Sequence, residues 1–359
     1  MSSYKDTDVD LIQLPKVKQG VPYIIDDFAL AMHLGVRCRT LWYLIVNKRD
    51  MYTRFTIPKK TGGKRVIHAP DARLKYVQGR IDQVLLRTQY LSDSVGAYRP
   101  GRGCRESAER HAGHYVRVAL DIHNFFPSHS RAEVRHFIRR NFGYDHRVRS
   151  MIADLCTVGE RIVSKGSATI RERHATPQGS PASPTLCNLM AQESIDTPIL
   201  SYLKDSGWVY TRYADDITLS HPEKKTRVDI QSVIDNVVGL IQAGGYRENR
   251  KKRRVQRQPA QQKMLGMVVN VHPNIPRYTY RVYRALLHNC LNHGFVVNAI
   301  RYGFDLAEST TGDDDDVLTL SFIAHLTGKI NYFHSVNPVK AAKLRAKLDA
   351  AVTKHAPDA

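Results

Sequence analysis

The sequence contains little cysteine and no long hydrophobic run. Its five cysteines are widely spaced and include no Cys-x-x-Cys pair, so we expect reduced thiols and neither a zinc site nor a disulfide framework. The longest apolar run near the start, LWYLIV at 41–46, is far shorter than the roughly 20 residues that span a bilayer. The opening segment MSSYKDTDVD is polar and acidic, unlike a secretory signal peptide. We therefore expect a cytoplasmic protein with no membrane partner.

Acidic residues are also scarce. Lys and Arg number 54 against 34 Asp and Glu, which gives a net charge of +20 and a pI near 9.8. Such a surplus indicates a polyanionic partner, and nucleic acid fits better than a membrane surface. Apolar residues make up 42% and charged residues 25% of the 359 positions, which excludes a mainly disordered chain and predicts two or three subdomains.

Hydrophobic periodicity predicts a mixture of helices and strands without an internal repeat. Helical spacing is found at 26–46, 71–91, 131–141, from 185 onward and at 228–243. Alternation predicts a strand over 115–122 and two hairpins, one over 52–68 and one with arms at 207–213 and 217–220. The chain from 273 onward is mostly helical in pattern, and we expect its acidic tract, Asp313–Asp316, in a mobile loop.

Two acidic sites stand out in this basic chain. Asp121 ends a hydrophobic strand, and Asp215 and Asp216 lie in the sequence YADD at the tip of an apolar, β-branched hairpin. Carboxylate oxygens on rigid elements suit Mg²⁺, and two such ions can serve an in-line displacement at phosphorus. A single Asp-Asp pair is often only a turn former, so the pair alone leaves a structural role open. The flanking strands favour the metal-binding interpretation.

Several segments resemble the conserved boxes of reverse transcriptases, and they occur in that family's order. Tyr213–Asp216 resembles the YxDD box, Leu120–Phe126 the first catalytic strand, and Thr176–Pro184 the QGxxxSP box between them. Three weaker likenesses are to the fingers hairpin (Phe55–Lys60 with Gly62–Arg65), the fourth palm motif (Gly245–Lys252) and the primer grip (Leu265–Asn270). Together they extend the resemblance over roughly residues 50–340.

The resemblance implies an α+β fold, a right-hand polymerase with fingers, an antiparallel-sheet palm and a helical thumb. Residues 1–115 would form N-terminal helices and fingers, and 116–272 the palm, with a fingers insertion at about 140–175. Residues 273–359 would form a helical thumb that binds RNA or a duplex. The change from strand-rich to helical sequence near 272 supports the last boundary.

Within this family the chain most resembles bacterial retron reverse transcriptases. Ser107–His111 stands where those enzymes carry an NAxxH box, with Ser in place of Asn, and Met264–Asn270 stands in place of their VTG box, with Met-Leu for Val-Thr. The resemblance implies RNA-directed synthesis of DNA from dNTPs, templated and primed by a structured noncoding RNA of the msr-msd type. It further implies a branched RNA-linked single-stranded DNA (msDNA) and a role in anti-phage defence with a separate effector protein.

Three alternatives remain open at the level of the sequence. A group II-like or abortive-infection reverse transcriptase would lack the retron branch; no maturase or endonuclease segment is visible, which argues against a complete group II intron protein. An RNA-dependent RNA polymerase is disfavoured by Phe126. A non-catalytic RNA-binding scaffold would use the basic surface alone, and the intact aspartates argue against it.

The resemblance assigns the catalytic and metal-binding roles to the aspartates. Asp121 and Asp215 would bind two Mg²⁺ ions, with the backbone carbonyl of Ile122 as a third ligand and Asp216 in support. Their like charges would repel one another unless metal and phosphate were present, which favours a magnesium-dependent site.

Nucleotide-binding residues are assigned in the same way. Phe126 would lie under the sugar of the incoming dNTP and exclude a ribose 2′-OH. Lys59 and Arg65 on the fingers hairpin would bind the triphosphate, with Lys60 and Lys64 as weaker candidates. Two further dNTP contacts are expected from the turn residues Gln178 and Gly179.

Lys252 stands where the family places a lysine near the leaving pyrophosphate, as a general acid or, equally, as part of a phosphate-binding run. A basic stripe is expected on one helical face near 276–292, with Val282, Ala285 and Leu286 turned toward packing. It would contact the backbone of an A-form duplex, although a solvated helix face has the same pattern. The stripe consists of Arg277, Arg281, Arg284 and His288.

Overall fold

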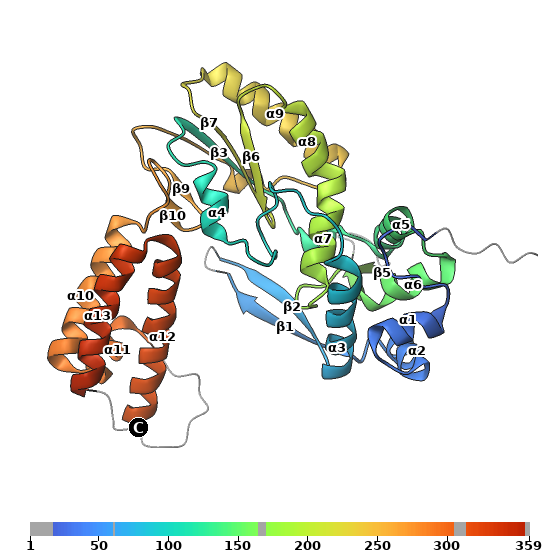
Figure 1. Ribbon diagram of the computed structural model, residues 1–359, viewed down its shortest axis with the longest axis horizontal. Helices are drawn as coiled ribbons and strands as arrows, with labels where there is room; N and C mark the ends of the chain where they lie inside the picture. Colours follow the sequence, from blue (N-terminus) through green and yellow to red (C-terminus); the bar gives the residue numbers. More distant parts are fainter. Residues whose placement is uncertain (1–16, 60–61, 164–169, 305–313, 356–359) are drawn as a thin grey trace, which may run out of the picture.

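The computed structural model describes residues 17–59, 62–163, 170–304 and 314–355. Figure 1 shows three units in a row: an N-terminal helical unit, a central sheet and a separate C-terminal bundle of helices. Each unit has its own cluster of buried apolar side chains. None of the helices in these described ranges has the length and apolar character that a membrane span requires.

The N-terminal unit packs short helices around one apolar core and extends a two-stranded ribbon toward the sheet (Figure 1). Its first elements are α1 (Asp27–Leu34), α2 (Cys38–Val46), β1 (Tyr52–Pro58), β2 (Lys64–Pro70), α3 (Ala72–Ile81) and the π-helical turn η1 (Asp82–Leu86). The ribbon confirms the hairpin predicted over 52–68. The helix predicted over 71–91 is shorter, because its α-helical part gives way to η1 and ends at Leu86.

Elements from the middle of the sequence complete the same core. They are α5 (Arg131–Phe142) and α6 (His146–Leu155). The ribbon of β4 (Val158–Val163) and β5 (Ile170–Ala175) follows α6 along the chain. Ser130 and Glu133 form a reciprocal capping box at the start of α5, and Gly143 ends that helix with a left-handed φ of 76°. These local signals explain why the helix predicted over 131–141 forms at 131–142.

The central sheet has four antiparallel strands in the order β6-β7-β3-β8. The strands are β3 (Val116–Asp121), β6 (Val209–Tyr213), β7 (Asp216–His221) and β8 (Arg254–Arg257). The surrounding helical elements are α4 (Cys104–Glu109), η2 (Phe126–Ser128), α7 (Ser183–Ala191), η3 (Gln192–Asp196), α8 (Thr197–Tyr202), α9 (Arg227–Ala243) and η4 (Arg250–Lys252). Apolar residues of η3, α8 and α9 share one core with the strands, so one face of the sheet is covered and its strands are held in a fixed register.

The C-terminal bundle contains α10 (Arg277–His293), α11 (Val296–Tyr302), α12 (Asp314–Val336) and α13 (Pro338–His355). The small ribbon of β9 (Lys263–Met264) and β10 (Met267–Val268) adds Met264 and Met267 to its core. One expectation was wrong: Asp314–Asp316 begin α12 instead of lying in a loop, and Asp313 falls outside the described residues. Acidic residues are favoured in the first turn of a helix by its macrodipole.

We predict that Leu344→Ala destabilises the bundle. Leu344 on α13 is completely buried, so truncation leaves a cavity and should cost about 2–5 kcal/mol of unfolding free energy in urea denaturation. The exposed neighbour Lys343 provides the control, because Lys343→Ala should change that value by less than about 0.5 kcal/mol. Equal effects of the two substitutions would contradict the position of this core.

Candidate active site

The two acidic sites meet at one end of the central sheet. Asp121 is the last residue of β3, and in the antiparallel register it lies directly opposite Asp216, the first residue of β7. Asp215 occupies the two-residue turn between β6 and β7, beside Ala214. Residues far apart in the sequence are therefore brought together by backbone pairing alone.

The turn is held in an uncommon conformation. Ala214 has a φ of 57°, in the left-handed region that residues other than glycine rarely adopt. The N–H of Ile122 donates to the carbonyl of Asp215 at 2.9 Å, which continues the contact between β3 and the turn. Such backbone strain persists only where the surroundings enforce it, and it is concentrated at functional sites.

Two of the aspartates, Asp215 and Asp216, have a raised pKa. Burial raises the pKa of Asp216 to about 6, with added repulsion from Asp215 and Asp121. Burial also raises the pKa of Asp215, to which Asp121 contributes and which Lys252 and Arg65 oppose. Negative charge therefore accumulates here at neutral pH and favours a bound cation.

Asp121 is paired with groups from the segment before β8. Its buried carboxylate accepts hydrogen bonds from Lys252 Nζ at 2.6 Å and from Asn249 Nδ2 at 3.0 Å, and its carbonyl accepts from the Asn249 N–H at 2.7 Å. Lys252 therefore lies beside Asp121. The sequence analysis did not predict the contact of Asn249 with Asp121. Asn249 stands in a basic run, and no local pattern there indicates that its side chain meets the end of β3.

The donor set suits Mg²⁺ bound jointly with a substrate. Within the described ranges, no three His, Cys, Asp or Glu side chains are arranged to enclose a metal ion by themselves. Mg²⁺ is commonly held by one or two carboxylates, with waters and substrate phosphates completing its octahedron. Asp215 and Asp216 offer such carboxylates at a point where Lys252 and nearby arginines offset only part of the negative charge, since the pKa of both groups stays raised.

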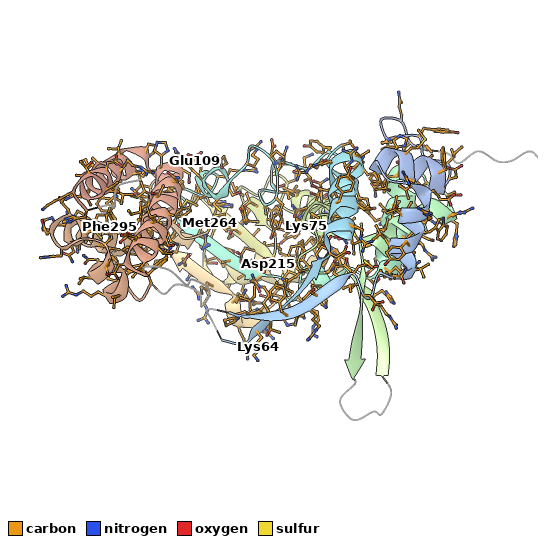
Figure 2. The ribbon with its side chains drawn as sticks, turned by 90° about the horizontal axis from the view of Figure 1, so that it is seen from below. Lys64, Lys75, Glu109, Asp215, Met264 and Phe295 are labelled. Atoms are coloured by element: carbon orange, nitrogen blue, oxygen red, sulfur yellow. The ribbon has the colours of Figure 1, made fainter. Side chains whose placement is uncertain are left out.

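The ribbon of β1 and β2 extends alongside the aspartates, with Lys64 at its tip and Asp215 behind it (Figure 2). Arg65 on β2 is exposed, and it is near enough to Asp215 to lower the pKa of that carboxyl. Lys59 is exposed at the end of β1, where its N–H bonds the Gly63 carbonyl at 2.9 Å. The weaker candidate Lys60 lies outside the described residues.

Gln178 and Gly179 join this ribbon to the turn before α7. The Gln178 carbonyl accepts the His68 N–H at 2.8 Å, and Gly179 has a φ of 126°. A Cβ built on Gly179 would lie 2.5 Å from the His68 carbonyl oxygen. Only glycine permits this approach, so the backbone of the turn is placed against the ribbon.

Phe126 and Phe125 have different environments. Phe125 is 4% exposed and belongs to the core, whereas Phe126 is only half-buried. The Phe126 backbone is held by Thr176, whose hydroxyl donates to its carbonyl. The ring of Tyr98, with its centroid 6.1 Å away, adds a second aromatic wall that the sequence pattern did not single out.

The box Ser107–His111 packs behind the catalytic hairpin. The His111 ring lies between the hydroxyls of Ser220 on β7 and Thr211 on β6, at 2.6 and 2.7 Å. Burial lowers the pKa of His111 to about 3, so the ring is neutral at physiological pH. It links the two arms of the hairpin inside the protein, away from any phosphate.

The predicted basic stripe lies on α10, in the separate bundle. Arg277, Arg281, Arg284 and His288 are all exposed. The packing face of this helix differs from the expectation in part: Leu286 packs against the core as expected, but Ala285 is exposed. The fully buried residues are Tyr283, Leu287 and Cys290. The bundle packs α10 against α11 and α13, and the Tyr283 ring meets Phe333 of α12 edge-on; the sequence of one helix does not specify these contacts.

The reverse transcriptase (RNA-dependent DNA polymerase) family model matches residues 57–269. That segment is more than half of the chain, and it includes both acidic sites and the turn before α7. The chain belongs to the reverse transcriptase family. Its α+β architecture is accordingly the right-hand polymerase fold.

Named relatives identify the branch of the family. The retron Mx65 reverse transcriptase of Myxococcus xanthus is 30% identical over 335 residues, covering 91% of this chain and 72% of that protein. The retron Ec86 reverse transcriptase of Escherichia coli is 28% identical, covering 75% and 79%. The retron Mx162 enzyme of M. xanthus is 29% identical, but this chain spans only 58% of its length. The chain is thus a retron-type RNA-directed DNA polymerase.

Solved structures give more distant likenesses. A telomerase from Candida albicans, in complex with a fragment of telomeric RNA, aligns with a TM-score of 0.47 at 12% identity. The alignment covers 84% of this chain and 63% of the telomerase.

We predict that Gly179→Ala lowers nucleotide incorporation by about tenfold or more, because the added Cβ forces the turn away from β2. Single-nucleotide extension on a primed RNA template measures the effect. Gly239→Ala on α9 is the matched control, because no atom lies within 4 Å of the Cβ it would add. Equal activity of the two variants would contradict a functional contact between turn and ribbon.

Proposed function

We propose that the aspartates at the end of the central sheet hold two Mg²⁺ ions, at which this enzyme copies part of a structured noncoding RNA into DNA. The register that sets Asp121 opposite Asp216 is the observation that carries this proposal. Asp121 and Asp215, with the carbonyl of Ile122, would be the ligands, and Asp216 would support them. The ions would activate the attacking hydroxyl and stabilise the leaving pyrophosphate.

Side chains of this chain would bind and orient the incoming dNTP. Arg65 and Lys59 on the ribbon would bind the triphosphate, and the turn at Gln178 and Gly179 would border the sugar and base. Phe126 would restrict the 2′ position of that sugar. Lys252 would donate a proton toward pyrophosphate once the substrate draws it away from Asp121, where it forms an ion pair at 2.6 Å.

We assign the three structural units to the parts of a polymerase. In this proposal the ribbon and N-terminal helices are the fingers, the central sheet is the palm and the helical bundle is the thumb. The exposed basic stripe on α10 then binds the backbone of the RNA–DNA duplex. The net charge of +20 supports an extended contact with polyphosphate.

The retron relatives support a specific partner. We propose an RNA of the msr-msd type that serves as template and supplies a 2′-OH primer, so that the product is a branched RNA-linked single-stranded DNA. A separate effector protein would use this product in anti-phage defence in the cytoplasm. Sequencing the nucleic acid that copurifies with the enzyme tests this proposal; an unbranched product would favour a group II-like or abortive-infection enzyme.

Asp215→Asn should abolish DNA synthesis, because an amide cannot replace a carboxylate at a site that binds cations. Binding of the copurifying RNA, measured by filter retention, should persist. Asp235→Asn on the exposed face of α9 is the control and should retain full synthesis. Wild-type synthesis by Asp215→Asn would refute the catalytic assignment and restore the scaffold alternative.

Phe126→Ala should admit ribonucleotides. Removing the ring opens space for a 2′-OH, and the preference for dNTP over rNTP in kcat/KM should fall by about tenfold or more. The control is Tyr90→Ala, because Tyr90 is 76% exposed. If Phe126→Ala retained its sugar discrimination, the ring would not be the gate.

A further inference from the structure

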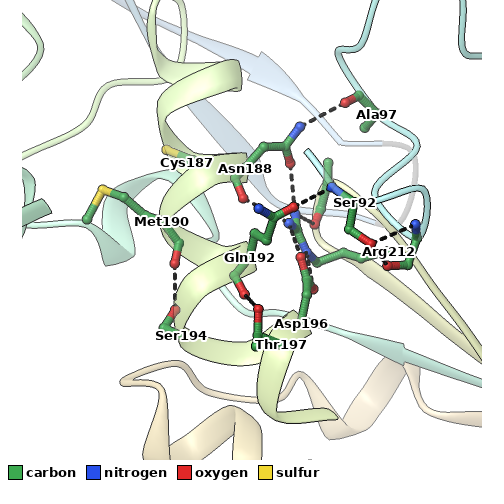
Figure 3. Close-up of polar contacts among 12 residues, drawn as sticks. Ser92, Ala97, Cys187, Asn188, Met190, Gln192, Ser194, Asp196, Thr197 and Arg212 are labelled. Carbon is green, nitrogen blue, oxygen red and sulfur yellow. Dashed lines mark hydrogen bonds and ion pairs between the residues drawn. The ribbon is translucent and has the colours of Figure 1, made fainter. Parts of the chain in front are cut away.

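A buried charge cluster lies directly behind the catalytic turn. Arg212, the residue before the YADD sequence, is completely buried, and so is its partner Asp196 at the end of η3. The guanidinium forms a fork with that carboxylate, with Nε–Oδ1 and Nη2–Oδ2 distances of 2.8 and 2.6 Å (Figure 3). Burying two charges carries a large desolvation cost and often adds nothing to stability, so the pair calls for another explanation.

The same guanidinium contacts the turn itself. Arg212 Nη1 donates to the Ala214 carbonyl at 3.1 Å. The next carbonyl, that of Asp215, accepts the Ile122 N–H at 2.9 Å. Two consecutive carbonyls of the strained turn are therefore fixed, one from behind and one from β3, and together they set the direction of the Asp215 side chain.

Arg212 also connects the turn to neighbouring elements. Its Nη1 and Nη2 donate to the side chain and backbone carbonyl of Asn188 on α7, at 2.8 and 3.1 Å. Asn188 in turn donates to the carbonyl of Ala97 at 2.8 Å (Figure 3). The guanidinium carbon lies 5.5 Å from the ring centroid of Phe125, the neighbour of Phe126.

We propose that Arg212, fixed by Asp196, is a positioning residue that aims Asp215 at the metal site. The inference rests on the proposed role of Asp215 as a metal ligand. A planar fork satisfies the carboxylate, Asn188 and the Ala214 carbonyl at once, which a lysine ammonium cannot do. The buried pair thus serves to hold the turn that carries Asp215 in place.

The first test is Arg212→Lys. The charge remains, but the ammonium cannot keep every contact, so kcat with Mg²⁺ should fall about tenfold or more while KM for dNTP changes little. Mn²⁺ should restore part of the rate, because Mg²⁺ demands stricter coordination geometry. The control is Arg131→Lys, since Arg131 at the start of α5 forms a similar fork with Asp154 on α6.

The second test separates catalysis from stability. The double variant Arg212→Met with Asp196→Asn removes both charges, retains comparable side-chain volume and keeps an acceptor for the Tyr210 hydroxyl that bonds Asp196. It should retain the wild-type melting temperature and still lose kcat with Mg²⁺, with the same partial recovery in Mn²⁺.

The outcomes are decisive in each direction. A folded double variant with wild-type kcat, or a loss of activity that is equal with both metals, would overturn the proposal. Failure of both variants to fold would show that Arg212 serves stability, which also overturns it. If Asp215→Asn is inactive and these variants behave as wild type, only this inference fails; if Asp215→Asn is active, the proposed function fails.

Discussion

The structure depends on holding like charges together. Three carboxylates converge at the end of one sheet, where burial, together with repulsion from Asp215 and Asp121, raises the pKa of Asp216 to about 6. Continuous hydrogen bonding between β3 and β7 imposes this arrangement, and the apolar core beneath the sheet holds both strands. Strand pairing and core packing offset the repulsion between the carboxylates. A bound cation would reduce that repulsion.

Positive charge is used differently on the two sides of this site. Arg65, Lys59 and the stripe on α10 are exposed, where cations can meet phosphate without prior desolvation. Arg212 behind the turn is completely buried, and its guanidinium is bonded to Asp196, Asn188 and the Ala214 carbonyl. Its charge is balanced by Asp196, so its main contribution is to fix the position of the turn. Arginine therefore occurs both exposed beside the site, as Arg65, and buried behind its turn, as Arg212.

The box that resembles the retron NAxxH motif also acts inside the protein. Its His111 connects the two arms of the hairpin through Thr211 and Ser220. Ser107, which replaces Asn, packs against Gly96: a Cβ added there would lie 2.0 Å from its hydroxyl. In this chain the motif packs against the central sheet, and the small Ser107 side chain stands where two segments approach closely.

The sequence alone determined the elements and the position of the chemistry along the chain. Strand alternation, the hairpin arms and the YADD turn are local patterns, so β3, β6, β7 and the aspartates could be predicted from them. The roles of Asn249, Tyr98 and Arg212 could not, because their partners come from distant segments and no local periodicity records such contacts. The packing face of α10 was decided by the neighbouring helices of the bundle. The start of α12 at acidic residues is favoured by the helix macrodipole. Only the tertiary structure sets which side chains meet, because register and packing join positions that the chain keeps far apart.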